Sequence, residues 1–442
     1  MLLRFVVKNL YSFKNETEFN LFPSSRATHH LHHKVQCNHV EALRLTSIYG
    51  ANGAGKSNLF KAITDLKNIV TKGSINGNTF QFFKFQLSKQ NLEEPVSMAI
   101  EFFYEGSVYY YSIEIDTGLV SYESLAIVEK EKDKLIFERR SNGNQSITFG
   151  KEYQKDKKNA FFSNVLQEKL LNKETLLLSF MAINYPEEIK GIKEAYSWFI
   201  EKLVIVQSEG LKNLTIAHFL DTDPKMMQLL QDLLPGMKTG ISRMSVVPRV
   251  LDENGLPPEW VNELKANSGY ARVVPSSFDS RVTASVVFEN GRIVLKELQP
   301  YHHSDDGMEV KMPINFESDG TIRLIEYVPM LYLILNRDCT VFIDEIERSL
   351  HPILVKEIIT KLSESEKANG QIVFTTHESC LLDQEILRPD EIWFAQKDNE
   401  QATQFYPLSD FSIHKTANIE NGYLNGRYGG IPFLSNLKDL HW

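Results

Sequence analysis

The sequence predicts an α/β fold, and three short apolar stretches lead to that class. Each stretch ends in polar residues: 43–49 precedes a glycine-rich run, Thr340–Ile343 precedes paired acids, and Ile372–Thr376 precedes His377. Buried parallel strands read as continuous apolar runs, and α/β folds bind their ligands at the carboxyl ends of such strands. We therefore expect the polar residues that follow these three stretches in the sequence to belong to one site.

The glycine-rich run is Gly50-Ala-Asn-Gly-Ala-Gly-Lys-Ser57, which fits the phosphate-binding pattern G-x-x-x-x-G-K-[ST]. Its glycines let the backbone curl with N–H groups turned inward, and the following helix adds its N-terminus, so a polyphosphate is favoured. We expect a nucleotide polyphosphate with Mg²⁺, with Lys56 bridging the β- and γ-phosphates and Ser57 offering its hydroxyl to Mg²⁺. A chance match is the alternative, which the flanking strand and helix disfavour. The predicted nucleotide-binding residues are Asn52, Gly53, Gly55, Lys56, Ser57 and Asn58.

The acids behind Thr340–Ile343 are Asp344 and Glu345. We expect Asp344 to hold Mg²⁺ through water and Glu345 to polarise the water that attacks the γ-phosphate. His377 is placed to reach the γ-phosphate and report its presence. The alternatives are a solvated acidic turn and a histidine that caps a loop. Together with the glycine-rich run, the motifs favour catalysis by Glu345 and His377 and metal binding by Ser57 and Asp344.

The composition is that of a soluble globular protein, with 442 residues of which 42% are hydrophobic and 24% charged. The net charge of −9 argues against a large surface that tracks nucleic-acid phosphates, although it leaves room for a local basic patch. Three cysteines, odd in number and far apart, indicate reduced thiols and a cytoplasmic location. The chain starts without a long apolar signal region and has no apolar stretch of membrane-spanning length, so no membrane partner is expected.

Other segments predict the domain organisation. Residues 2–10 and 13–22 are expected to pair as strands, and 80–125 is rich in β-branched and aromatic residues, which favour a sheet. Helical spacing marks 160–201 and 226–234, whereas 241–250 and 282–298 read as strands. We expect an N-terminal lobe over 1–130, an inserted helical and β subdomain over 131–300, and a C-terminal lobe over 301–442.

Residues 28–39 contain five histidines and a cysteine. These residue types are common metal ligands, but their spacing matches no structural zinc pattern. A solvated loop before the strand at 43–49 explains the run as well, so both interpretations stay open.

Ser318-Asp-Gly320 stands before a helix predicted to begin at Thr321, with an apolar part over Leu324–Leu335. Serine and glycine at a helix N-terminus can form an anion site, and a simple N-cap is the alternative. The order along the chain favours the anion site: phosphate loop, Ser-x-Gly helix start, acid pair, a short loop with Ser349, strand and histidine.

In this order of motifs the chain resembles the ATP-binding-cassette class of P-loop ATPases, in the branch that contains recombination-repair and chromosome-maintenance heads. It looks most like the stand-alone AAA-type ATPases of bacterial phage-defence and toxin-like operons. The resemblance is carried by 2–14, 48–59, 317–323, 342–352 and 422–432, at both ends of the chain. It implies an α/β P-loop fold of the ABC-ATPase-head type, two-lobed, that hydrolyses ATP to ADP and phosphate.

In this family two heads enclose two ATP molecules. The resemblance therefore implies a homodimer or a higher even oligomer, in which Ser318 and Gly320 contact the γ-phosphate held by Lys56 of the other copy. The loop with Ser349 would cross the interface. The helix start departs from the Leu-Ser-Gly-Gly form of transporters. A glutamine that senses Mg²⁺ is also implied, and Gln81 and Gln86 are both candidates.

The role implied by the resemblance is a molecular switch that controls a separately encoded effector, such as a Toprim-type or other nuclease from the same operon, in anti-phage defence. The alternatives are a DNA-repair ATPase that binds DNA directly and an ATP-dependent assembly scaffold with little turnover. The acidic net charge weighs against the first alternative, and Glu345 weighs against the second.

The stretch Asn421–Pro432 holds four glycines, which disfavour a regular helix or a central strand. Its aromatic residues are too apolar for a solvated linker. We expect an ordered, irregular segment whose aromatics pack on the head, either as a pinned terminus or as a part that couples the head to its effector.

Overall fold

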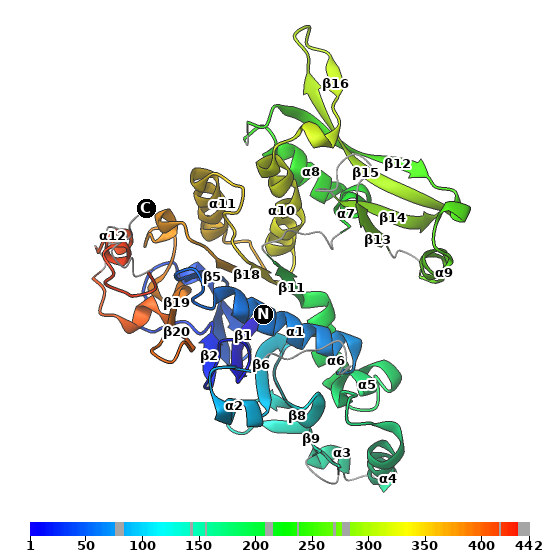
Figure 1. Ribbon diagram of the computed structural model, residues 1–442, viewed down its shortest axis with the longest axis vertical. Helices are drawn as coiled ribbons and strands as arrows, with labels where there is room; N and C mark the ends of the chain where they lie inside the picture. Colours follow the sequence, from blue (N-terminus) through cyan, green and yellow to red (C-terminus); the bar gives the residue numbers. More distant parts are fainter. Residues whose placement is uncertain are drawn as a thin grey trace. The chain divides into compact units, whose positions relative to one another are not determined.

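The computed structural model describes residues 1–75, 84–141, 145–154, 157–207, 215–236, 238–267, 271–275, 283–414 and 417–431 (Figure 1). The chain divides into two units, unit 1 with Met1–Ile205, Asp338–Ile346 and Ile359–Trp442, and unit 2 with Val206–Arg337 and Glu347–Ile358. This division differs from the three domains expected from the sequence, because strands on both sides of residue 130 belong to one sheet. Those domain boundaries stay a prediction.

Unit 1 contains a six-stranded sheet in the order β11-β17-β18-β5-β19-β20. Its parallel strands are β5 (Leu45–Tyr49), β17 (Thr340–Ile343), β18 (Gln371–Thr375) and β19 (Ile392–Lys397). β20 (Thr403–Pro407) pairs antiparallel with β19, and β11 (Leu203–Val206) forms the other edge. The three predicted apolar strands are confirmed. Because β5 lies between β18 and β19, distant parts of the chain form the centre of the sheet.

The helix after the glycine-rich run is α1 (Lys56–Lys72). Leu59, Ile63, Leu66 and Val70 are buried at helical spacing, so one face of α1 packs in the core. Gly73, with φ of 75°, ends the helix and donates its N–H to Ile69 O. Packing along this face fixes the N-terminus of α1 at the end of the glycine-rich run.

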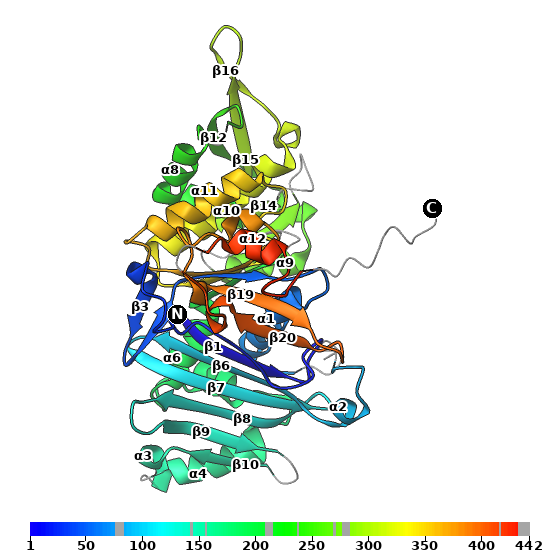
Figure 2. The same ribbon diagram turned by 90° about the vertical axis from the view of Figure 1, so that its left-hand side faces the viewer.

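A second sheet of unit 1 has seven antiparallel strands in the order β10-β9-β8-β7-β6-β1-β2 (Figure 2). The predicted pairing of 2–10 with 13–22 is confirmed by β1 and β2, and three consecutive tyrosines of the segment 80–125, residues 109–111, lie in β7, in agreement with the predicted sheet. The β6–β7 turn uses Glu105 and Gly106 with positive φ of 45° and 79°. The strands are β1 (Leu2–Lys8), β2 (Thr17–Asn20), β6 (Val96–Tyr104), β7 (Ser107–Asp116), β8 (Leu119–Val128), β9 (Lys134–Arg140) and β10 (Ser146–Phe149).

Short helices complete unit 1. The helical character predicted for 160–201 is confirmed, in several pieces rather than one helix. Trp198, directly after α6, stacks on Phe102 of β6 with ring centroids 4.2 Å apart, which joins these helices to the antiparallel sheet. β3 (Lys34–Cys37) and β4 (Val40–Leu43) form a small separate sheet. The helices are α2 (Lys89–Glu93), α3 (Lys151–Gln154), α4 (Lys157–Val165), α5 (Leu177–Asn184) and α6 (Ile192–Ser197).

Unit 2 is built on a five-stranded sheet with β12, β15, β14 and β13 side by side and β16 paired to β15. The strands predicted at 241–250 and 282–298 are confirmed over their described residues, the second as β14 and β15 joined by a turn at Asn290 and Gly291. The bounds are β12 (Ile241–Val250), β13 (Ala271–Pro275), β14 (Thr283–Glu289), β15 (Arg292–His303), β16 (Glu309–Lys311), α7 (Ile216–Thr222), α8 (Pro224–Leu233) and α9 (Pro258–Ala266).

Two longer helices follow the sheet of unit 2. α10 (Asp319–Asn336) begins just before the predicted start at Thr321, because Ser318 caps its first turn. α11 (Pro352–Glu364) is continuous across the unit boundary between Ile358 and Ile359. Within the described ranges, no helix is both long and apolar enough to cross a membrane.

The C-terminal part of unit 1 contains α12 (Ile419–Leu424). The prediction that glycines exclude a regular helix from Asn421 onward is wrong, because Gly422 lies inside α12, where the ring of Tyr428 leaves no room for a side chain. The prediction that the aromatic residues pack is confirmed, since Tyr423 and Tyr428 are buried.

Candidate nucleotide-binding site

The glycine-rich run between β5 and α1 is tightly enclosed at two of its glycines. A Cβ added to Gly55, whose φ is 109°, would lie 2.1 Å from Thr403 Oγ1. A Cβ added to Gly50 would lie 2.6 Å from Ala395 O. At Gly53, with φ of 78°, nothing lies within 4 Å of an added Cβ. β19 and β20 therefore pack closely against the loop at Gly50 and Gly55, and its tip at Gly53 is exposed.

Lys56 reaches back over this loop. Its Nζ donates to Gly50 O at 2.6 Å and lies 3.3 Å from His377 Nε2, and the residue is 6% exposed. No side chain caps the N-terminus of α1, and its first turn carries no acid. A buried ammonium, inward-curled glycines and an uncapped helix N-terminus suit a polyphosphate, so the residues present fit the expected nucleotide.

Asn58 takes part in the anchoring of the loop. Its Nδ2 donates to Ser12 Oγ at 2.8 Å, and Ser12 Oγ lies 2.7 Å from Thr403 Oγ1. Thr403 also donates to Ala54 O in the loop, at 2.8 Å. The sequence analysis did not single out Ser12 or Thr403, which connect the loop to the β1–β2 turn and to β20.

The paired acids follow β17, next to the end of β18. Thr375 Oγ1 donates to Asp344 Oδ1 at 2.6 Å and accepts the N–H of Glu345 at 2.7 Å. Asp344 is 5% exposed, so one of its oxygens is fixed in a buried position. Glu345 has a left-handed backbone with φ of 51°, and its half-buried carboxylate makes no hydrogen bond to any described residue. The two carboxylates are therefore held differently, although they are adjacent in sequence.

His377 follows β18 after Thr376 and is exposed. Because Lys56 Nζ is a donor, His377 Nε2 accepts in their 3.3 Å contact, which places the neutral ring beside the loop. The strand order puts β17, β18 and β5 next to one another in parallel, so Asp344, His377 and the glycine-rich run share one edge of the sheet.

The remaining predicted residues of unit 1 are less defined. Ser57 lies half-buried in the first turn of α1, and Asn52 is exposed at the loop tip. Gln86 is exposed, and its Nε2 donates to Lys84 O at 2.8 Å. Gln81 lies outside the described residues, so the choice between the two glutamines stays open.

Ser318 and Gly320 lie in unit 2, where Ser318 Oγ accepts from Thr321 N at 3.1 Å as an N-cap. A Cβ added to Gly320 would lie 2.8 Å from Ser349 O, so the glycine permits close approach of the loop with Ser349. Both residues line a cavity of about 470 Å³, together with Thr321, His302, Phe316 and Ser349. We call it the signature cavity. His302 Nε2 lies 2.7 Å from Glu317 Oε1 at its wall.

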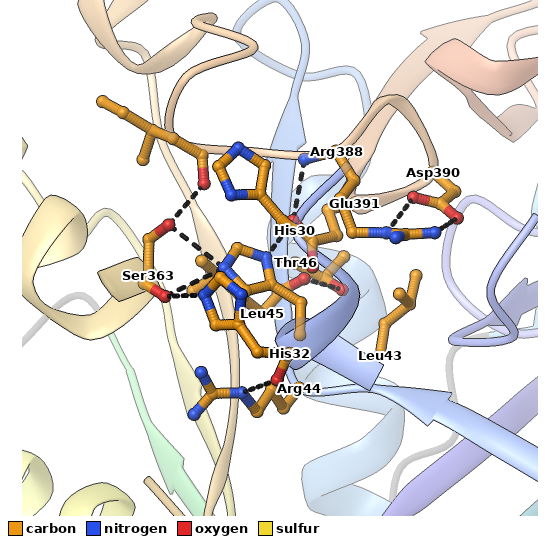
Figure 3. Close-up of polar contacts among 12 residues, drawn as sticks. His30, His32, Leu43, Arg44, Leu45, Thr46, Ser363, Arg388, Asp390 and Glu391 are labelled. Carbon is orange, nitrogen blue, oxygen red and sulfur yellow. Dashed lines mark hydrogen bonds and ion pairs between the residues drawn. The ribbon is translucent and has the colours of Figure 1, made fainter. Parts of the chain in front are cut away.

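The histidine run of residues 28–39 belongs to unit 1, and Figure 3 shows its residues His30 and His32 close to Ser363. The Nε2 atoms of His32 and His33 lie 2.7 and 3.0 Å from Ser363 O, which can only accept. With its Nε2 donating, a neutral His33 must accept at Nδ1, which lies 2.8 Å from Glu391 Oε1, so a protonated Glu391 donates. Burial lowers the pKa of His33 to about 4 and raises the pKa of Glu391 well above its usual range, which fits this assignment.

The spacing of these histidines would also allow a metal ion, because donor atoms of His30, His32 and His33 lie within 4.8 Å of one another. However, both ring nitrogens of the buried His33 are used in hydrogen bonds, to Glu391 and to Ser363 O, so this residue offers no ligand atom, and His30 Nε2 lies 3.0 Å from Gln384 O. We therefore assign the histidines a structural role: they connect residues 30–33 to the end of α11 and to the residue before β19.

Comparison with known proteins supplies the family. Residues 45–383 match the model of the family described as "AAA domain, putative AbiEii toxin, Type IV TA system". Since the match covers most of the chain, the chain belongs to this family of AAA-type ATPases. No curated protein matches it. The family expected from the sequence and the α/β P-loop fold class are thereby confirmed.

Solved structures of SMC heads are also similar. The SmcHead bound to the C-winged helix domain of ScpA is 13% identical with a TM-score of 0.39, over 94% of this chain and 99% of that chain. The SMC head domain from Thermotoga maritima is 12% identical with a TM-score of 0.35, over 93% of this chain and 99% of that chain. The Smc head with an extended coiled coil bound to the C-terminal domain of ScpA, derived from Pyrococcus furiosus, is 13% identical with a TM-score of 0.38, over 92% and 96%.

Proposed function

We propose that the chain is an ATPase of the ATP-binding-cassette type, which binds ATP with Mg²⁺ and hydrolyses it to ADP and phosphate. The observation that carries the proposal is the meeting of three motifs in unit 1. Lys56 Nζ lies 2.6 Å from Gly50 O and 3.3 Å from His377 Nε2, at strand ends that also carry Asp344. Phosphate oxygens can take over Lys56 from the carbonyls of the loop, because an ammonium prefers an anionic partner.

Each residue of the site has a role in this proposal. Lys56 and the N–H groups around Gly53 and Gly55 bind the phosphates. Ser57 and Asp344 would hold Mg²⁺, which when bound neutralises charge on the transferred phosphoryl group. Glu345, whose carboxylate is free of described partners, orients the attacking water and takes its proton, and His377 contacts the γ-phosphate.

The signature cavity of unit 2, in this proposal, completes the nucleotide site of a second copy. Ser318 offers its Oγ at the N-terminus of α10, and Gly320 keeps the backbone there accessible. Phe316 and Ile353, in the segments that form the cavity, are 70% and 67% exposed. Exposed apolar side chains beside an open cavity suit a surface that a partner covers, which supports the proposed homodimer or higher even oligomer that closes around ATP.

The output that we propose is control of a separately encoded effector in cytoplasmic anti-phage defence. The family description names a toxin of a type IV toxin–antitoxin system, which supports a two-component arrangement. A nuclease of the Toprim or another type, from the same operon, is the effector class that we favour. The thiols of Cys37 and Cys339 are buried and free, as suits a reducing compartment.

The test combines turnover with partner capture. The purified chain should release phosphate from ATP only with Mg²⁺ present. In capture from cells that express the whole operon, the ATP-trapped Glu345→Gln chain should enrich one effector that the Lys56→Ala chain does not. Hydrolysis without any nucleotide-dependent partner would leave the ATPase activity standing and contradict the control of an effector. Capture of stoichiometric DNA instead of a protein would favour the DNA-repair alternative.

A further inference from the structure

The C-terminal segment, defined here as Asn418–Ile431, packs beside the strand that carries the glycine-rich run. It consists of α12 and a turn region in which Gly429 and Gly430 have φ of 70° and 69°. Tyr423 and Tyr428 stack on Phe394 of β19, with ring centroids 5.6 and 6.1 Å apart. Because β19 is the neighbour of β5, this packing brings the segment to the nucleotide-binding edge of unit 1.

The first contact of the segment with the site is between two glycines. A Cβ added to Gly430 would lie 3.7 Å from the Cα of Gly50, the first residue of the glycine-rich run. Gly430 is held there by Tyr423, whose hydroxyl donates to Gly430 O at 3.3 Å. Gly50 in turn supplies the carbonyl that accepts from Lys56. The segment thus supports the backbone to which Lys56 is bound.

The second contact is with the loop that carries His377. Ser379 Oγ donates to Glu420 Oε1 at 2.7 Å, and Glu420 belongs to α12. The same loop is held by Tyr49, whose hydroxyl donates to Glu378 O at 3.2 Å and whose ring lies 5.7 Å from that of Tyr423. One segment therefore touches both the start of the glycine-rich run and the loop after His377. These two parts of the site are far apart in sequence, since Lys56 and His377 are separated by 321 positions.

We propose that the C-terminal segment is a positioning element of the nucleotide site, in which Glu420 sets the position of the His377 loop and Gly430 supports Gly50. The inference rests on the proposed ATPase function. Neither residue reaches the reacting atoms itself, since each acts through a neighbour. Because coupling between two sites is reciprocal, bound nucleotide must in turn stabilise the segment.

Hydrogen exchange tests this reciprocity in the full-length Glu345→Gln chain. Calorimetry first measures whether ATP with Mg²⁺ binds, and failure at this step contradicts the proposed function. If ATP binds, amide exchange over 418–431 should slow on binding. Unchanged exchange in that segment, with protection over 50–58 as the positive control, would overturn the inference and leave the ATPase function standing.

Substitutions test the link to His377. Ser379→Ala and Glu420→Ala should each lower kcat about three- to tenfold, the value of one hydrogen bond, with KM for ATP within about twofold of the unmodified chain. The double variant should be no worse than either single one, because both remove the same bond. Glu420→Gln keeps an acceptor oxygen and should restore most of kcat. Asn421→Ala, exposed on the same helix, is the matched control, and effects equal to the control or fully additive losses would overturn the link.

A glycine pair tests the link to the glycine-rich run. Gly426 and Gly430 both have positive φ, 77° and 69°, so a side chain strains the backbone at both. A Cβ at Gly430 would lie 3.7 Å from Gly50 Cα, an ordinary van der Waals contact, so a larger side chain is needed to displace the run; a Cβ at Gly426 would meet Ile431 instead. Gly430→Leu should weaken ATP binding about three- to tenfold, whereas Gly426→Leu should not, at matched melting temperatures. Equal losses in both variants would show that backbone strain alone is responsible and would overturn this link.

Discussion

The glycine-rich run of unit 1 and the signature cavity of unit 2 are both candidate phosphate-binding regions, but they differ in how far each is complete. The glycine-rich run is enclosed by Thr403 and Ala395 and contains the buried ammonium of Lys56. The signature cavity is bordered by Phe316, which is 70% exposed. An enclosed site with its own cation can bind a nucleotide alone, whereas an open cavity with exposed apolar groups fits half of an interface. The predictions below test this difference.

The largest expected effect is that of Lys56→Ala. Removing the ammonium deprives the phosphates of a charge-assisted donor, at a cost of about 3 kcal/mol, so ATP affinity should fall on the order of a hundredfold and hydrolysis should become undetectable. Calorimetry and phosphate release measure the two effects. Lys61→Ala, on the exposed side of the same helix, is the control. Unchanged ATP affinity in Lys56→Ala would remove unit 1 as the primary binding site.

Glu345→Gln should separate binding from turnover. The amide cannot accept the proton of the attacking water, so kcat should drop on the order of a hundredfold or more while ATP affinity is kept. The ATP-bound dimer should then accumulate in size-exclusion chromatography with light scattering. Glu366→Gln, at an exposed carboxylate outside the candidate site, serves as control. Steady-state hydrolysis near that of the control would show that Glu345 is not the base.

Mixing two inactive variants tests whether the signature cavity acts on the other copy. Gly320→Asp places a side chain where even an added Cβ would lie 2.8 Å from Ser349 O. With random pairing of Lys56→Ala and Gly320→Asp chains, half of the dimers carry one intact composite site, so about a quarter of full ATPase activity should return. A chain with both substitutions should stay inactive. No recovery in verified mixed dimers would mean that the site is complete within one chain.

The smallest expected effect concerns pH and the scaffold of unit 1. Burial lowers the pKa of His33 from 6.5 to about 4 and raises the pKa of Glu391 well above its usual value of 4.5. Between about pH 4.5 and 6.5 the unfolded pair carries its proton on the histidine and the folded pair carries it on Glu391, so this pair leaves stability nearly independent of pH. His33→Gln removes the histidine proton of the unfolded chain, so the melting temperature of this variant should fall as the pH rises from 4.5 to 6.5. His39→Gln, in the same stretch, should not, and an equal change in both variants would contradict the assignment.

Much of this site could be predicted from the sequence because its chemistry lies in contiguous runs. The pattern 50–57, the acids after β17 and the histidine after β18 are local signals, and the structure brings them to one sheet edge. Thr375 and Thr403 were missed because nothing local marks them. Thr375 matters through its pairing with Asp344 across two strands, and Thr403 contacts Ala54 at a separation of 349 positions.

The helix at Gly422 was missed for a related reason. Glycine is unfavourable in an isolated helix, but in α12 its missing side chain is where Tyr428 packs. The contact between Tyr428 and Gly422 forms only after the segment folds back, and it stabilises the helix. Helix propensity, which is a local quantity, does not include such a tertiary contact.

The central place of β5 between β18 and β19 has a consequence for folding during translation. During synthesis the glycine-rich run leaves the ribosome long before its neighbours, since Lys56 and His377 are 321 positions apart. At about 5–20 residues per second, this delay is on the order of half a minute. A nascent chain therefore cannot assemble the site until translation is nearly finished, and a prematurely terminated chain that lacks β18 and β19 would carry the motif without the site.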